Sequence, residues 1–242
     1  GENITTIMPL PENEREWENL YIMFTTEKGN VRKNKLSDFV DVRANGKIAM
    51  KLQDKDEIKT VETCTDDDDL LITTLKGQCI RFRASDVRLF VGRSSTGVRG
   101  IRLAQDDRVI SSAIIKSMSA TTEERAAYLK MSRAVRGDID SENDENEENV
   151  ENITPAILSD EKYAEMGASE QFVLSISNNG YGKRTSTFEY RVTGRGGKGI
   201  IAMVVNDRNG NIADSFPVDS TNQIILVTNN GKLIRCPVDD IR

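Results

Sequence analysis

The residues of this chain that could do chemistry begin with a glycine-rich loop, Gly194-Arg195-Gly196-Gly197-Lys198-Gly199. Glycines let a backbone approach a polyanion closely, while Arg195 and Lys198 bring positive charges that suit phosphate groups. The three spaced glycines also match the dinucleotide-binding fingerprint, but that fingerprint needs a helix after the loop. The run that follows, 200–205, is typical of a strand. We therefore predict a phosphate-binding loop and no Rossmann site.

The composition disfavours a catalytic centre. None of the 242 residues is histidine, which removes Ser-His and Cys-His pairs, His-ligated zinc and the commonest general base. Cys64, Cys79 and Cys236 lack metal-ligand spacing and predict reduced, mostly buried thiols of an intracellular protein. No nucleotide-binding P-loop motif, secretory leader or apolar run of about 18 residues occurs. We expect no catalytic residue, metal or cofactor in this chain, and no membrane association.

The segments that we expect to position the glycine-rich loop belong to a repeat that recurs along the chain. One layout occurs four times: an apolar run, a turn with glycine, and a second run that opens with basic residues. Each copy predicts a β-hairpin. Gly29 and Gly77 are 48 residues apart and Gly180 and Gly231 are 51 apart, so the period is close to fifty. The four copies are 21–39, 70–87, 172–190 and 224–241.

A glycine loop with a further apolar run follows each of the first three hairpins, and a last strand follows each loop, at 58–64, 109–115 and 212–218. Four strands per repeat are typical of a propeller blade, so we predict an all-β, propeller-like fold. A β-sandwich of unrelated hairpins is the alternative. The predicted division is a blade remnant at 1–18, blades at 19–64, 65–115 and 169–218, an acidic insert at 119–168, and a partial blade at 219–242.

The insert explains the charge of the chain, which is −6 overall. Residues 119–168 carry a net −8 and the remainder a net +2. Thr121 and Glu124 form a capping box that predicts a helix to about Arg136. A low-complexity acidic tract follows, and Thr154-Pro155 is a candidate start for a second short helix that ends near Gly167. The tract is either a solvated linker or a mimic of DNA that weakens binding by competing for the basic surface.

Asp66 to Asp69 could suggest a metal site, but they lack the spacing of an ion cage, and the aligned place in a later repeat reads Asp219-Ser220-Thr221-Asn222. We predict a solvated turn between blades.

Basic residues occupy matched places in the hairpins and loops. If the blades are arrayed about one axis, they form a curved stripe that suits the backbone of duplex DNA. Without aromatic stacking residues the stripe is less suited to single strands. The alternative is ordinary solvated charge. The hairpin cations are Arg32, Lys33, Lys35, Arg81, Arg83, Lys183, Arg184, Lys232 and Arg235; the loop cations are Arg43, Lys47, Arg93, Arg99, Arg195 and Lys198.

Three segments together resemble the C-terminal domain of the A component of DNA gyrase. They are G-Y-G-K-R-T…E-Y-R-V-T-G-R-G-G-K-G-I at 180–200, V-G-R-S-S-T-G-V-R-G-I-R-L at 91–103, and G-K-L-I-R-C-P-V-D-D-I-R at 231–242. The resemblance covers all four hairpins and leaves out the insert. It implies a six-bladed β-pinwheel that wraps duplex DNA around a basic rim. Thr193 to Gly199 resembles the family's glycine-rich box, which normally sits in the first blade.

The resemblance also implies partners and a setting. They are duplex DNA, the remainder of gyrase A, and gyrase B, in the bacterial cytoplasm. The cleaving tyrosine and the site that uses ATP and Mg²⁺ would lie outside this chain. Because the chain holds three blades and two partial ones, we expect a cropped pinwheel with weakened DNA binding and lost wrapping. The alternatives are the corresponding domain of topoisomerase IV and a propeller that serves only to dock proteins.

Overall fold

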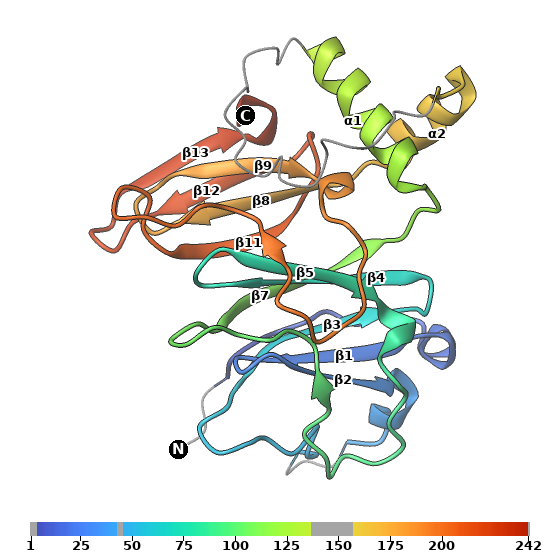
Figure 1. Ribbon diagram of the computed structural model, residues 1–242. Coiled ribbons are helices and arrows are strands. Elements are labelled where there is room, and N and C mark those ends of the chain that lie inside the picture. The colour runs from blue at the N-terminus through green and yellow to red at the C-terminus, as the bar shows by residue number, and fades with distance from the viewer. Residues whose placement is uncertain (1–3, 43–45, 137–156, 242) are drawn as a thin grey trace.

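The computed structural model describes residues 4–42, 46–136 and 157–241. Its regular structure is mostly antiparallel β-sheet, as the repeats predict, with two α-helices and several short 3-10 turns. Figure 1 shows the sheets stacked in tiers, from the blue strands of the first hairpin to the orange and red strands of the last. In the described residues no helix is long and apolar enough to cross a membrane.

The four predicted hairpins are all present, and each turns through a glycine with positive φ. A last strand pairs with the first strand of each of the first three hairpins. The hairpin strands are β1 (Tyr21–Thr26) with β2 (Asn30–Lys35), β4 (Asp68–Thr74) with β5 (Gln78–Arg83), β8 (Phe172–Ser177) with β9 (Gly182–Ser186), and β12 (Gln223–Val227) with β13 (Leu233–Pro237); the last strands are β3 (Ile58–Cys64), β7 (Val109–Lys116) and β11 (Ile212–Val218).

The remaining strands cross between repeats, which contiguous four-stranded blades would not do. β6 (Val98–Arg99) pairs with β2 of the preceding repeat, and β10 (Ile200–Ile201) pairs with β5. The sheet orders are therefore β3-β1-β2-β6, β10-β5-β4-β7, β11-β8-β9 and β12-β13. The predicted segment boundaries stay a prediction, but neighbouring segments share sheets.

Two glycines make this crossing possible. A Cβ on Gly97 would lie 2.3 Å from the carbonyl oxygen of Val31, and one on Gly199 would lie 2.0 Å from that of Cys79. Both have positive φ, at +81° and +78°. Any side chain would push the crossing strand away from its sheet, so glycine at these places fixes how the sheets interlock.

The core forms between neighbouring sheets. Ile72, Ile80 and Phe82 of the second sheet pack with Val31 of the first and with Ile101 beyond β6. On its other face, Leu71 and Cys79 pack with Val173 and Tyr190 of the third repeat. Strands of the second sheet are thus buried on both faces, as in the interior layer of a stack.

The insert adds two helices to the third sheet: α1 (Thr122–Arg136) and α2 (Asp160–Ser169). The capping box is confirmed, since the Thr121 amide donates to Glu124 Oε2 at 2.7 Å and the Glu124 amide donates to Thr121 Oγ1 at 3.1 Å. Tyr128 and Met166 of the helices bury Phe188 of the third repeat.

The predicted start of the second helix is wrong. Thr154 and Pro155 lie outside the described residues, but 157–159 are not helical, and α2 begins at Asp160. The Ser159 side chain caps it by accepting from the Lys162 amide at 3.2 Å. A serine followed by two acidic residues satisfies the first amides of a helix, whereas proline only tolerates that place.

Candidate nucleic-acid interface

Three of the predicted hairpin cations are buried and bonded within the protein. Arg32 is 0% exposed. Its Nε donates to Asn34 Oδ1 at 2.9 Å, its Nη1 donates to the carbonyl of Ser95 at 2.7 Å, and its guanidinium lies 4.7 Å from the centroid of the Phe90 ring. The next repeat therefore satisfies this side chain, and it is not available to solvent.

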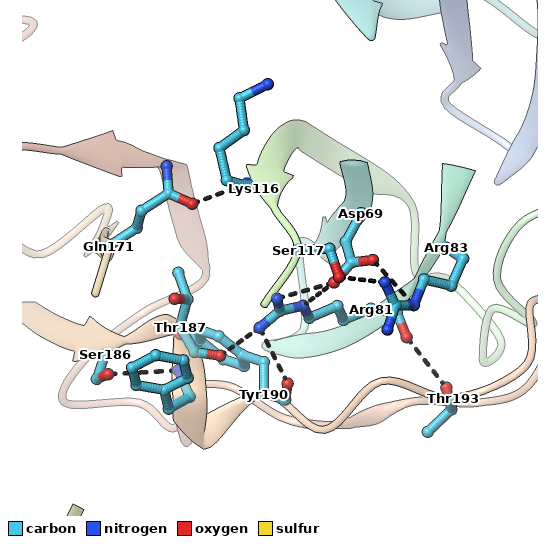
Figure 2. A network of polar contacts seen from close by, with 11 residues as sticks. Asp69, Arg81, Arg83, Lys116, Ser117, Gln171, Ser186, Thr187, Tyr190 and Thr193 are labelled. Carbon is cyan, nitrogen blue, oxygen red and sulfur yellow. Dashed lines mark hydrogen bonds and ion pairs between the residues drawn. The ribbon is translucent and has the colours of Figure 1, made fainter. Parts of the chain in front are cut away.

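Lys33 and Arg81 are also bonded to the next repeat, and each of them pairs with a carboxylate as well. Lys33 Nζ lies 2.5 Å from Asp66 Oδ1 and donates to the carbonyl of Ala84 at 2.9 Å. Arg81 donates through Nε to Asp69 Oδ2 at 2.8 Å and through Nη1 to the carbonyl of Thr187 at 2.6 Å (Figure 2).

A common geometry explains these contacts. Lys33, Arg81 and Arg184 each lie four residues after a hairpin glycine, and each donates to the carbonyl of the first residue of a 3-10 turn in the next repeat. The three turns are Ala84–Asp86, Thr187–Glu189 and Val238–Asp240. These inter-repeat cations hold each sheet to the next one along the chain.

The expectation of an exposed hairpin stripe is therefore wrong for Arg32, Lys33 and Arg81. Burying a cation requires compensating partners, and the repeated carbonyls and carboxylates supply them. Arg184 is mostly buried and lies 3.2 Å from Asp239 Oδ1. Arg235 occupies the fourth matched position, where it is exposed and donates to Gln223 Oε1 at 2.6 Å. The other hairpin cations are exposed at Lys35 and Lys232 and half-buried at Arg83 and Lys183.

The solvated aspartate turn is also only partly right. Asp66 and Asp67 are exposed, but Asp68 and Asp69 are 2% and 0% exposed. Asp68 pairs with Lys116 at 2.7 Å, and Asp69 compensates Arg81. Within the described ranges there is no group of His, Cys, Asp or Glu that could hold a metal ion. Asp68 and Asp69 are therefore paired with cations of the protein itself.

The predicted loop cations are less buried than Arg32, Lys33 and Arg81. Arg43 lies outside the described residues, and Lys47 is half-buried and donates to the carbonyl of Asp38 at 2.6 Å. Arg93 is half-buried, whereas Arg99, Arg195 and Lys198 are exposed. The glycine-rich loop lies directly beside the crossing strand of the preceding repeat.

Backbone hydrogen bonds join these two segments. The Gly196 amide donates to the carbonyl of Gly100 at 2.6 Å, and the Arg102 amide donates to that of Gly197 at 2.7 Å. Arg195 Nη1 donates to the carbonyl of Arg99 at 3.1 Å. The bonds made by Arg195 go to the carbonyls of Asp86 and Arg99, and no ion pair with it is found in the part of the chain that the structure describes. The two loops thus form one surface, which we call the crossing ridge, defined by Arg99, Arg102, Arg195 and Lys198.

Arg102 is not among the cations that the repeats predict. It is exposed, and it follows Ile101, which is 1% exposed. Apolar and basic residues alternate at Val98-Arg99 and again at Ile101-Arg102, and this pattern is the signal that could have identified Arg102.

Burial shapes the titration of several groups. It raises the pKa of the Cys64 and Cys79 thiols to about 12, so both stay protonated, and the described cysteines are free, with Cys236 half-buried. Burial also raises the pKa of the Glu62 carboxyl to about 7, against a hydrogen bond from the Ile114 backbone.

A stack of antiparallel sheets that exchange strands, with basic crossing loops, defines a propeller-like domain. The chain matches the family model described as "DNA gyrase C-terminal domain, beta-propeller" over residues 20–65, 68–116, 171–219 and 222–242, and it belongs to that family. The matched ranges leave out the helical insert.

Relatives and solved structures agree with this assignment. The gyrase A protein of Rickettsia bellii is 45% identical over 241 residues, covering 100% of this chain and 26% of the relative. That of Escherichia coli is 32% identical, covering 99% and 21%. The chain thus spans about a quarter of these relatives. The C-terminal domains of DNA topoisomerase IV and DNA gyrase A share the fold, with TM-scores of 0.65 and 0.61 at 18% and 22% identity, covering 93% and 90% of this chain and 54% and 55% of theirs.

Proposed function

We propose that this chain binds duplex DNA through the crossing ridge and is the DNA-wrapping part of a gyrase. The observation that carries the proposal is the pairing of two successive loops, which sets Arg99, Arg102, Arg195 and Lys198 on one exposed surface. Because backbone hydrogen bonds join the two loops, their cations lie on one surface, and each cation can neutralise a phosphate of the same duplex.

The inter-repeat cations contribute to DNA binding indirectly. Lys33, Arg81 and Arg184 fix each repeat against the next, so the positions of the loops on successive repeats are fixed as well. A rigid, repeated spacing of cations can hold DNA along a defined curved path. Within the longer protein, such a path would present a second duplex segment for strand passage and so introduce negative supercoils.

The chain does no chemistry in this proposal. The partners are duplex DNA, the remainder of gyrase A, and gyrase B, in the bacterial cytoplasm, and cleavage and ATP hydrolysis take place outside this chain. The corresponding domain of topoisomerase IV shares the fold, but the 45% and 32% identities are to gyrase A proteins.

A salt titration tests DNA binding directly. Counterion release predicts that log K falls with log salt by about 0.9 for each neutralised phosphate. The chain should bind a linear duplex with a steep slope that becomes shallower when ridge cations are removed. A protein-docking module would show no such slope, and a flat titration would contradict the proposal.

A further inference from the structure

The fourth hairpin, β12 with β13, exposes the face that each earlier hairpin buries against the next repeat. The residue six positions before the hairpin glycine lies on this face in every repeat. It is 1% exposed at Met23, 2% at Leu71 and 0% at Leu174, but 59% exposed at Ile225. Val227, on the same face, is 66% exposed. An exposed apolar face of this kind marks an interaction site.

The edges of this hairpin are unpaired as well. Among the described residues, β12 has no last strand beside it like β3, β7 and β11, and β13 has no crossing strand beside it like β6 and β10. An unpaired edge presents a row of backbone N–H and C=O groups that another strand can satisfy.

The first repeat carries an unpaired segment of the crossing kind. Gly46 has a positive φ of +78°, like Gly97 and Gly199, but a Cβ on Gly46 would meet no atom within 4 Å. Ile48, two residues further on, is 74% exposed. Residues 46–50 thus begin with the glycine conformation of a crossing strand but have no partner strand in the part of the chain that the structure describes.

Residues 4–10 are a segment of the other kind. Their sequence, I-T-T-I-M-P-L, has the pattern of β11, I-A-D-S-F-P-V, with proline at the same place. Met8 packs against the same core cluster as Ile58 and Val61 of β3. Ile4 and Ile7 are 85% and 87% exposed. The segment therefore lies beside the first sheet as the last strand of a preceding repeat would, with apolar side chains outward.

We propose that a second copy of this chain docks head to tail on the fourth hairpin. Its residues 4–10 pair with β12 as the last strand, and its residues 46–50 pair with β13 as the crossing strand. The completed sheet has the order of the first sheet, in which β1 and β2 lie between β3 and β6. Strand addition at free edges satisfies backbone groups on both partners.

The junctions within the chain fix the register of this docking. A Cβ on Gly97 would lie 2.3 Å from the carbonyl oxygen of Val31, which stands two residues after a hairpin glycine. Leu233 holds the matched position in the fourth hairpin and is 60% exposed. Gly46 of the second copy therefore lies against the Leu233 carbonyl.

Arg235 completes the junction. The inter-repeat cations donate to the carbonyl of the first residue of a 3-10 turn in the next repeat. In the first repeat that turn is η2 (Leu36–Phe39). Arg235 occupies the matched position and therefore donates to the carbonyl of Leu36 of the second copy, in place of Gln223.

The partner is a second copy because the two ends of one chain lie apart. Figure 1 shows the first hairpin at the bottom of the stack and β12 and β13 at the top, with the sheets of the second and third repeats between them. A head-to-tail contact leaves one free end on each copy, so assembly continues beyond a dimer unless the ends meet in a ring. The docking does not depend on DNA binding, and its test contains no DNA.

Sedimentation velocity of the intact chain at increasing concentration provides the test. The wild type, with a chain mass of 27.0 kDa, should form dimers and larger species. Val227→Glu blocks the exposed hairpin face and Ile48→Glu blocks the crossing segment, so each variant alone should stay monomeric. Both side chains are exposed, so neither variant should change the thermal midpoint of the monomer. Val135→Glu on α1, where Val135 is 78% exposed, is the matched control and should assemble like the wild type.

An equimolar mixture of Val227→Glu and Ile48→Glu is the sharpest measurement, because each variant keeps one intact end. The mixture should form a dimer and nothing larger. A mixture that stays monomeric, or either variant assembling alone like the wild type, would overturn the proposal. A wild type that is monomeric at every concentration would also overturn it, and would leave the hairpin to a segment of a longer protein.

Discussion

Asp69 and Arg81 form a buried ion pair between the two strands of one hairpin. Arg81 Nη2 lies 2.8 Å from Asp69 Oδ2, and the Arg81 and Asp69 side chains are 4% and 0% exposed. Arg81 then continues to the carbonyl of Thr187 in the next repeat. The carboxylate of Asp69 holds Arg81 in one hairpin, and through Arg81 it also helps to position the next repeat.

Breaking this pair should be costly. Asp69→Asn leaves a buried guanidinium without a counter-charge, so we expect the free energy of unfolding to fall by about 3–5 kcal/mol in urea denaturation. Asp67→Asn, at an exposed neighbouring position, should change it by less than about 0.5 kcal/mol. Equal effects of the two substitutions would mean that Asp69 does not compensate Arg81.

The crossing strand β10 requires glycine at position 199, whereas position 194 of the same glycine-rich loop should tolerate a side chain. Gly199→Ala sets a Cβ against the Cys79 carbonyl at a positive φ, and should cost several kcal/mol, above the roughly 1–2 kcal/mol of left-handed strain alone. A Cβ on Gly194 meets no atom within 4 Å, so Gly194→Ala is the matched control. Thermal unfolding of both variants checks this, and a stable Gly199→Ala protein would refute the crossing geometry.

Glu62 predicts a pH dependence of stability. Burial raises the pKa of this carboxyl to about 7, whereas an unfolded glutamate titrates near 4.3. The folded protein therefore holds the proton more tightly than the unfolded chain does. Stability from this group is fully present below about pH 4 and is lost as pH rises through 7, by up to about 3 kcal/mol.

Glu62→Gln isolates that effect. The variant should lose the part of the fall in stability between pH 5 and pH 8 that Glu62 causes, when urea midpoints are compared with those of the wild type. Parallel pH profiles for the two proteins would show that Glu62 titrates normally in the folded state.

The acidic tract supports a separate prediction about binding. Deleting all of 119–168 would also remove Tyr128 and Met166, which bury Phe188, so a milder change is needed. Replacing the carboxylates between Asp138 and Glu151 by amides should tighten DNA binding, most strongly at low salt, if the tract competes for the basic surface. Unchanged affinity at low salt would identify the tract as a linker.

Much of the fold could be predicted because its signals are local. A glycine turn between β-rich runs predicts a hairpin, and Thr121 with Glu124 predicts the start of α1. The crossing strands could not be found this way. β6 has two residues, and its partner β2 lies more than sixty residues earlier, so no local pattern names that partner.

The burial of the cations in the candidate interface could be predicted only in part, for a related reason. Charged residues in a strand usually indicate a solvated face, and the burial of Arg81 depends on a carbonyl at Thr187 far along the chain. The loop cations Arg99 and Lys198 are exposed, as expected of glycine-rich loops that rarely enclose long side chains. Repetition thus located the matched cations but did not show which were structural.

Contact between the crossing ridge and DNA phosphates is the step on which the proposed function depends. The most direct test is a titration of linear duplex DNA at several salt concentrations with the wild type, with Arg99→Ala/Arg102→Ala/Lys198→Ala combined, and with Lys130→Ala as the control. We expect the combined variant to bind more weakly, with a salt slope shallower by about 2–3 units, and the control to match the wild type. A combined variant with the affinity and slope of the wild type would contradict DNA contact at the ridge.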